Sequence, residues 1–246
     1  MFSGGIRYDT GSFLGFYLLY FMRKHLEKVV FAAVAAAFFV PLLVPYHSYI
    51  FPFIVPKIIW FRSLVVVMLT AYALLLVVNY RYYKIRLTPV TGLVLAYLLS
   101  LILSTFTGLD WYRSFWDGHE RMLGLFTLVH YIGFYLVLSH ANFDKTKWQW
   151  LVRLFMTGAS VVMMVGIAQK INPTVLLNNG SDRVAGTLGN SIYLGGYGLF
   201  LIWLAVLAAA REKENWWRVY AGLMGLFGLS GLLFSGTRGT LLGLVA

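Results

Sequence analysis

Long, continuous apolar runs separated by short polar connections make up most of the chain. None of the runs alternates with a period of two, so none predicts a strand. Their lengths approach or reach the ~20 residues that a helix needs to cross the ~30 Å hydrocarbon core of a bilayer. The pattern predicts an all-α, polytopic transmembrane helical bundle that forms one transmembrane domain over residues 1–246. Its about seven complete spans are expected at 29–46, 58–79, 89–106, 122–139, 150–168, 191–210 and 216–234.

Two shorter apolar runs lie near the ends of the sequence. The first, Gly11–Met22, is too short to span, and its cationic cluster follows it. We therefore expect an N-terminal interfacial or re-entrant helix, with half of a split signal anchor as the alternative. The second begins near Gly239 and stops at Ala246, which gives roughly 12 Å of helix. Because a membrane helix that stops in mid-bilayer exposes unpaired backbone groups, this run predicts a truncated eighth span of a longer membrane domain.

Composition narrows the class of protein. Of the residues, 60% are apolar and 12% are charged, and a soluble domain carries roughly twice that charged fraction. The net charge is +11, but the basic residues are spread among the connections. Membrane lipids are therefore expected as partners, and nucleic acid is not. The chain has no cysteine, which excludes disulfides and thiolate metal sites. The sequence contains no spaced metal motif, and we expect no cofactor.

The distribution of lysine and arginine predicts an orientation. With a cytoplasmic N-terminus, 13 of the 20 basic residues fall in inner segments and 7 in outer ones. This agrees with the excess of cations in cytoplasmic loops of membrane proteins. Residues 107–121, 169–190 and 235–238 are then expected on the outer face.

Two of these outer connections have an unusual composition, "GSDRVAGTLGN" (180–190) and "FSGTRGT" (234–240). Each combines an arginine with glycine and threonine just before an apolar run. Guanidinium groups bind phosphate oxygens bidentately, and glycine lets backbone N–H groups approach an anion at a helix start. Arg183 and Arg238 therefore predict a site for a lipid-linked diphosphate. The alternative is that both arginines anchor helix ends at lipid headgroups.

The stretches "RVAGTLGNSIYLGGY", "FSGTRGTLLGL" and "SFWDGHERMLG" resemble the O-antigen ligase and O-antigen polymerase family of bacterial envelope glycosyltransferases. In that family an Arg-x-x-Gly-Thr-x-Gly-Asn stretch, usually continuing with proline, precedes a span. A Ser-x-Ser-Arg-Gly motif then opens a later helix. Here Ser191 replaces the proline and Thr237 replaces the second serine. The resemblance covers most of the chain in layout and about thirty residues in motif.

The resemblance implies a multi-pass protein of the bacterial inner membrane with a cytoplasmic N-terminus. Its activity would be transfer of a glycan from an undecaprenyl-diphosphate (polyprenyl-diphosphate) carrier to an acceptor glycan or lipid, without a metal. Arg183 and Arg238 match the paired catalytic arginines of the family. The other residues expected to bind substrate are Arg121, Gly186, Thr187, Gly189, Asn190, Ser235, Thr237 and Gly239. Arg121 is expected to face the same outer cavity as Arg183, because its spacing to Gly124 parallels that of Arg183 to Gly186.

The sequence leaves several points open. It offers four candidates for a base that accepts the proton of the acceptor hydroxyl, namely Asp117, His119, Glu120 and Asp182. His130, inside the fourth span, is either functional or a neutral residue that bonds a neighbouring helix. The glycines spaced by three from Gly222 to Gly231 favour helix packing over a ligand channel, and Gly195, Gly196 and Gly198 are expected to have the same role.

Two other classes of protein remain open. One is a transporter or flippase of a lipid-linked or anionic substrate, and the other is a non-catalytic partner in envelope assembly. Transporters usually place charged groups near the middle of the membrane, but most charges here lie at the ends of spans. That distribution favours a site at the membrane surface.

Overall fold

The computed structural model describes residues 10–45, 51–118, 120–177 and 182–246, and every regular element in them is helical. This confirms the all-α prediction. By length and composition, six helices can cross a membrane. They are Leu18–Leu42, Val55–Val78, Pro89–Thr107, Lys145–Ile171, Ser191–Arg211 and Asn215–Ser235. The chain therefore has the architecture of a multi-pass membrane protein.

The helices begin where the sequence supplies capping groups. Asp144 and Asn190 each accept a hydrogen bond from a backbone N–H of the helix that follows, and Thr88 does the same just before Pro89.

In chain order the elements are α1 (Thr10–Ala37), η1 (Val40–Leu42), α2 (Val55–Val78), α3 (Tyr80–Tyr83), α4 (Pro89–Thr107), α5 (Trp111–Trp116), α6 (Leu125–His140), α7 (Lys145–Ile171), η2 (Val175–Leu177), η3 (Gly186–Leu188), α8 (Ser191–Arg211), α9 (Asn215–Ser235) and α10 (Arg238–Val245).

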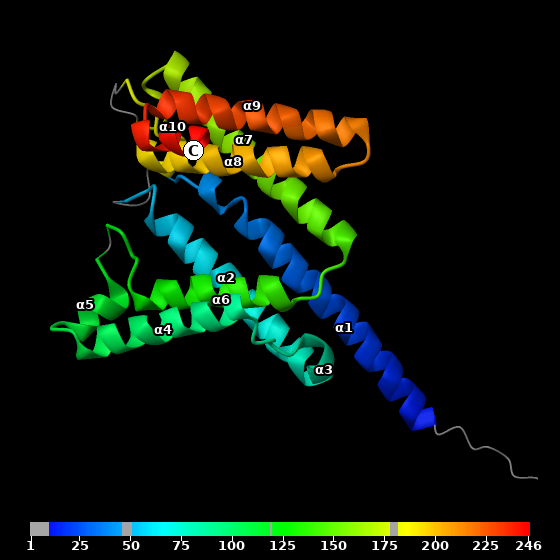
Figure 1. The fold of residues 1–246 in the computed structure, drawn as a ribbon. Coiled ribbons are helices and arrows are strands. Elements are labelled where there is room, and N and C mark those ends of the chain that lie inside the picture. Colours follow the sequence, from blue (N-terminus) through cyan, green and yellow to red (C-terminus); the bar gives the residue numbers. More distant parts are fainter. Residues whose placement is uncertain (1–9, 46–50, 119, 178–181) are drawn as a thin grey trace, which may run out of the picture.

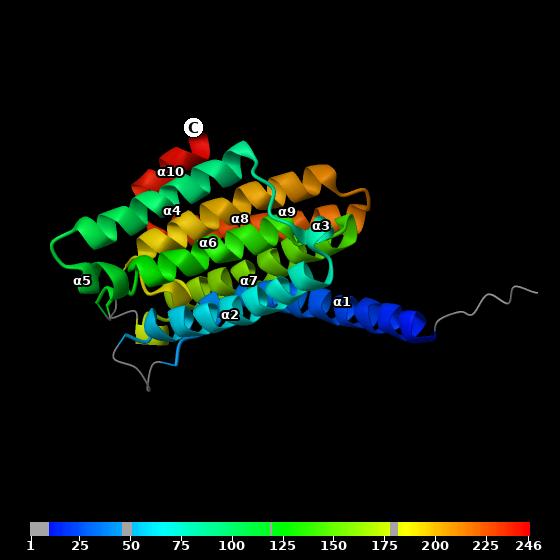
Figure 2. The same ribbon diagram turned by 90° about the horizontal axis from the view of Figure 1, so that it is seen from below.

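The N-terminal part differs from the sequence-based expectation. The structure does not confirm a separate interfacial helix over Gly11–Met22, because α1 runs unbroken from Thr10 to Ala37. Residues 16–40 contain neither glycine nor proline, so nothing in the sequence interrupts the helix. Its N-terminal half extends past the end of the other helices, and Leu18 to Met22 are exposed there (Figures 1 and 2).

The fourth apolar run also forms a shorter helix than expected. The span was expected at 122–139, but α6 covers only 16 residues, or ~24 Å, which leaves it below the usual length of a span. Its start is delayed because Asp117 and Met122 adopt positive φ angles of 62° and 52° and fold a turn in front of it. Within the described residues there are thus six candidate spans and one shorter apolar helix, so a count of seven complete spans is not confirmed.

Two apolar cores hold the helices together. The first joins α1, α2 and α6 with Tyr83 and the start of α7, and the second joins α7, α8 and α9. Helix α7 contributes to both, with Leu151 in the first core and Met156 in the second. Val184, from the connection between α7 and α8, is buried in the second core. This residue anchors one of the arginine-bearing loops to the bundle.

Glycines allow α9 to pack closely on α8 and on α7. A Cβ on Gly198 would lie 2.6 Å from the carbonyl oxygen of Gly228, and one on Gly231 would lie 2.0 Å from the sulfur of Met163. The expected packing role is confirmed at these three glycines. It does not extend to Gly196 or Gly222, where a Cβ would meet nothing within 4 Å. The close pairing brings the end of α9 beside the start of α8.

The connections alternate between two ends of the bundle. Those between α4 and α6, α7 and α8, and α9 and α10 lie at one end, which we call the loop end (Figures 1 and 2). Helix α3 and the connections between α6 and α7 and between α8 and α9 lie at the opposite, basic end. The described parts of the three segments expected on the outer face therefore share one end of the molecule.

Candidate functional site

The two arginine-bearing loops bind directly to each other at the loop end. The N–H of Val184 donates to the carbonyl oxygen of Phe234 at 3.1 Å. Arg183 Nε donates to the carbonyl oxygen of Ser235 at 3.0 Å, and Arg183 Nη2 donates to Thr237 Oγ1 at 3.1 Å. Residues fifty or more positions apart in the chain thus form one unit. We call residues 182–190 and 234–238 the double loop.

Gly236 makes room for this contact. Its φ of +60° is a left-handed conformation that favours glycine, and it ends α9. A Cβ at this position would lie 3.4 Å from Cγ of Arg183, so the Arg183 side chain runs directly over the Gly236 backbone. The glycine therefore turns the chain and leaves the arginine space to reach Ser235 and Thr237.

Thr237 connects the double loop to a third segment. Its hydroxyl accepts from Arg183 and donates to the carbonyl oxygen of Ser191 at 3.3 Å. A hydroxyl has one proton to donate and lone pairs to accept with, so both bonds can exist together. Ser191 is the first residue of α8, and Asn190 caps that helix by accepting from the N–H of Ile192 at 2.8 Å. Arg183, Thr237 and the start of α8 therefore form a continuous chain of hydrogen bonds.

Arg238 follows Thr237 directly and is the first residue of α10. Its side chain is exposed and makes no hydrogen bond or ion pair with the residues that the structure describes. Gly239 is exposed beside it, with nothing within 4 Å of an added Cβ. The structure thus brings the Arg183 and Arg238 motifs together, with Arg183 bonded across the double loop and Arg238 open to solvent.

Three of the residues expected to bind substrate lie inside the fold. The N–H of Gly186 donates to Gln169 Oε1 at 2.7 Å, and Thr187 is buried. Ser235 is fully buried, with its hydroxyl donating to the carbonyl oxygen of Leu232 at 2.7 Å. These three residues support the double loop from inside the bundle, and the residues next to them form its surface.

Two residues that sequence reasoning did not select fix the 182–190 loop in place. Gln169 is buried near the end of α7, and its Nε2 donates to the carbonyl oxygens of Val175 at 3.1 Å and Gly186 at 3.3 Å. Lys57, near the start of α2, donates to the carbonyl oxygen of Thr187. Gln169 directly follows the apolar run expected at 150–168, and no sequence pattern indicated that α7 continues past it to Ile171 and buries its amide, which then needs partners.

A cavity of about 350 Å³ lies next to the double loop. We call it the side cavity. Gly189, with a φ of +72°, packs so closely on Phe53 that a Cβ would come within 2.5 Å of the ring. The lining residues come from three connections and the start of α8, and they are Phe51, Pro52, Phe53, Ile54, Glu120, Arg121, Leu188, Gly189, Asn190 and Tyr193.

Arg121 was expected to face the same cavity as Arg183. Its position in the side cavity places it near Gly189 and Asn190, at the far end of the loop that begins with Arg183. Arg183 itself contacts Ser235 and Thr237 and does not line this cavity. The shared cavity is therefore not confirmed, although Asn190 joins the two regions as a lining residue and as the cap of α8.

The carboxylate candidates for a base differ in their surroundings. Hydrogen bonds from the backbone N–H groups of Leu123, at 2.8 Å, and then of Gly118 lower the pKa of Asp117, which makes it a weak base and a structural part of its turn. Asp182 is exposed, and its carbonyl oxygen accepts from Lys170. Glu120 lines the side cavity. His119 lies outside the described residues.

Two ionisable side chains lie within the helices at this end. His130 Nδ1 pairs with the carbonyl oxygen of Phe126 at 2.7 Å, so its bond lies within its own helix and not with a neighbouring one. Arg62, in α2, is one of the seven basic residues expected on the outer side. Its Nη2 donates to the carbonyl oxygen of Met122 at 3.3 Å and to Thr127 Oγ1. Arg62 thereby holds the turn that carries Arg121.

Comparison with known proteins gives no match to a family model, a curated protein or a solved structure.

Proposed function

We propose that the protein is an integral-membrane glycosyltransferase of the O-antigen ligase and polymerase type. It transfers a glycan from an undecaprenyl-diphosphate carrier to a hydroxyl of an acceptor glycan or lipid. The observation that supports this most strongly is the contact of Arg183 with Ser235 and Thr237, at 3.0 and 3.1 Å. It joins two loops that each carry an arginine with glycine and threonine nearby.

The chemistry of the proposed transfer needs such a pair of arginines. The acceptor oxygen attacks C1 of the sugar, the bond from C1 to the diphosphate oxygen breaks, and its electron pair leaves with the diphosphate. The proton of the acceptor hydroxyl goes to a base. Negative charge grows on the leaving diphosphate, and positioned guanidinium groups stabilise it. Arg183 is held in place before substrate binds, and Arg238 is free to meet the same anion.

The side cavity supplies a place for the sugar next to the diphosphate. Its volume of about 350 Å³ lies within the range of small-ligand sites. Tyr193 and Phe53 offer aromatic rings, and Arg121 and Glu120 offer a donor and an acceptor for sugar hydroxyls. Glu120 is the carboxylate that we assign as the candidate base, because it is the one that lines this cavity.

The proposed location is the bacterial inner membrane, with a cytoplasmic N-terminus and the loop end outside. The excess of cations at the basic end supports this orientation. A surface site also fits the observation that the two arginines lie at the ends of helices, where a carrier with its diphosphate at the headgroup level can reach them.

The test is glycan transfer in membrane vesicles that contain the intact protein and an undecaprenyl-diphosphate-linked glycan. Arg238→Lys keeps the charge but loses the planar fork that binds two phosphate oxygens, so we expect transfer to fall at least about tenfold. Arg183→Ala should weaken donor binding by a similar factor. Arg113→Lys is the control, because Arg113 is exposed at the same end but outside the double loop. Equal transfer by the Arg238 and Arg113 variants would leave the arginines as headgroup anchors.

A further inference from the structure

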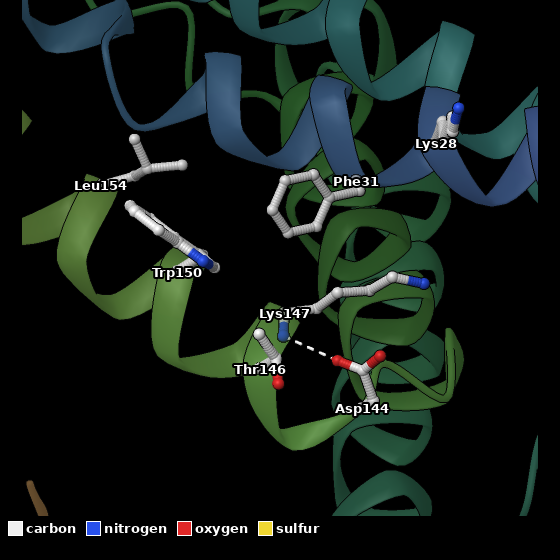
Figure 3. Close-up of a pocket in the computed structure, with 7 residues that line it drawn as sticks. All are labelled: Lys28, Phe31, Asp144, Thr146, Lys147, Trp150 and Leu154. Carbon is white, nitrogen blue, oxygen red and sulfur yellow. Dashed lines mark hydrogen bonds between the residues drawn. The ribbon is translucent and has the colours of Figure 1, made fainter.

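A second cavity lies at the basic end, between α1 and α7. It has a volume of about 370 Å³ and takes no part in the proposed glycan transfer, since the double loop is at the opposite end. Figure 3 shows its lining, which combines two lysines with three apolar side chains. The lining residues are Lys28, Phe31, Asp144, Thr146, Lys147, Trp150 and Leu154. We call it the lysine groove.

The polar side of the groove carries an excess of positive charge. Glu27, next to the groove, is already shared by Arg23 Nε at 3.1 Å, Lys147 Nζ at 3.3 Å and the hydroxyl of Tyr83. Asp144 caps α7, accepting from the N–H of Lys147 at 2.7 Å. Both carboxylates therefore have partners in the fold. Lys28 is exposed and makes no ion pair with the described residues.

The other side of the groove is apolar. Figure 3 shows Phe31 on α1 and Trp150 on α7 turned toward the space between the two helices, with Leu154 one turn further along α7. Trp150 is 47% exposed, as a tryptophan at the boundary between headgroups and hydrocarbon would be. Along α1 the charged stretch ends at Lys28 and the apolar stretch begins at Val29. The groove thus lies where the surface of the protein changes from polar to apolar.

We propose that the lysine groove binds one acidic phospholipid. Its phosphate contacts Lys28 and Lys147, and its acyl chains run along Phe31, Trp150 and Leu154 into the surrounding bilayer. The volume suits a headgroup with its glycerol, and the unpaired lysine selects an anionic headgroup over a zwitterionic one. The lipid would bridge α1 to α7, the helix that belongs to both apolar cores.

The proposal can be tested on the purified protein by native mass spectrometry. Phosphatidylglycerol is titrated against phosphatidylcholine with the same acyl chains, and we expect phosphatidylglycerol to be retained more strongly. Lys28→Gln should weaken its apparent affinity about fivefold, because each basic residue near an anionic headgroup contributes about that factor. Lys213→Gln is the control, an exposed lysine at the same end but outside the groove, and should change nothing.

A second variant distinguishes lipid binding in the lysine groove from a general attraction of anionic lipids to a basic surface. Leu154→Trp fills the apolar side without changing any charge, and it should also weaken phosphatidylglycerol binding at least fivefold. An unchanged thermal midpoint confirms that each variant is folded. Equal retention of the two lipids, equal losses in the Lys28 and Lys213 variants, or full binding by Leu154→Trp would each overturn the proposal.

Discussion

At the scale of single residues, the hydroxyl of Thr237 holds three segments together. It accepts from Arg183 of the 182–190 loop and donates to the first residue of α8. A serine at this position would carry the same hydroxyl, since the threonine methyl group takes no part in either bond.

Thr237→Val tests this role, because it keeps the shape of the side chain and removes the hydroxyl. The Nη2 of Arg183 and the carbonyl oxygen of Ser191 then lose a partner, which typically costs ~1–3 kcal/mol for each buried group and less for exposed ones. We expect glycan transfer to fall at least severalfold, while Thr237→Ser stays within about twofold of the unchanged protein. If the valine and serine variants transfer equally well, the hydroxyl does not organise the site.

Among the residues of the double loop, some features could be predicted from the sequence and others could not. The arginines, glycines and threonines of the two loops were selected from composition, and the meeting of their motifs could be predicted because α8 and α9 return the chain to the same end. Which loop groups face outward could not be predicted. That depends on tertiary hydrogen bonds such as the two between Gln169 and Gly186, which no local pattern specifies.

At the scale of elements, the close packing of α8 on α9 sets the geometry of the double loop. Gly198 and Gly228 let the two backbones approach, so that Ser191 and Thr237 come within hydrogen-bond distance. The sequence predicted α8 and α9 well, because a long apolar run in a membrane pairs all of its backbone groups only by forming a helix. The sequence placed the starts of α1 and α6 less well. Helix α1 runs unbroken through the charged residues that were expected to separate two apolar runs. The start of α6 is delayed by a turn with positive φ angles at Asp117 and Met122.

Gly228→Ala tests the packing directly. The added Cβ would lie 2.9 Å from the carbonyl oxygen of Gly198, so the helices must move apart, at a cost of ~1–3 kcal/mol. We expect the thermal midpoint of the purified protein to fall by several degrees. Gly222→Ala, on the same helix but facing open space, should leave the midpoint unchanged or raise it, because alanine is the better helix former. Equal midpoints for the two variants would show that the contact carries no strain.

At the scale of the whole molecule, the two ends of the bundle differ in chemistry. The loop end holds the double loop and the side cavity, and the basic end holds the lysine groove and most of the cations. A carrier lipid with a diphosphate and an acidic phospholipid would therefore bind at opposite faces of the membrane. This separation lets the orientation be tested independently of either binding event.

Single-cysteine labelling measures the orientation, because the chain has no cysteine of its own. Ser114→Cys places a thiol at the exposed surface of α5 at the loop end, and Asn215→Cys places one at the exposed start of α9 at the basic end. In intact spheroplasts a membrane-impermeant maleimide should label the first and should label the second only after permeabilisation. The reverse pattern would put the double loop in the cytoplasm and exclude glycan transfer at the outer face. Between the two positions the chain passes along α6, α7 and α8. Labelling of both thiols from one side would therefore mean that α6, the shortest of the three, does not cross the membrane.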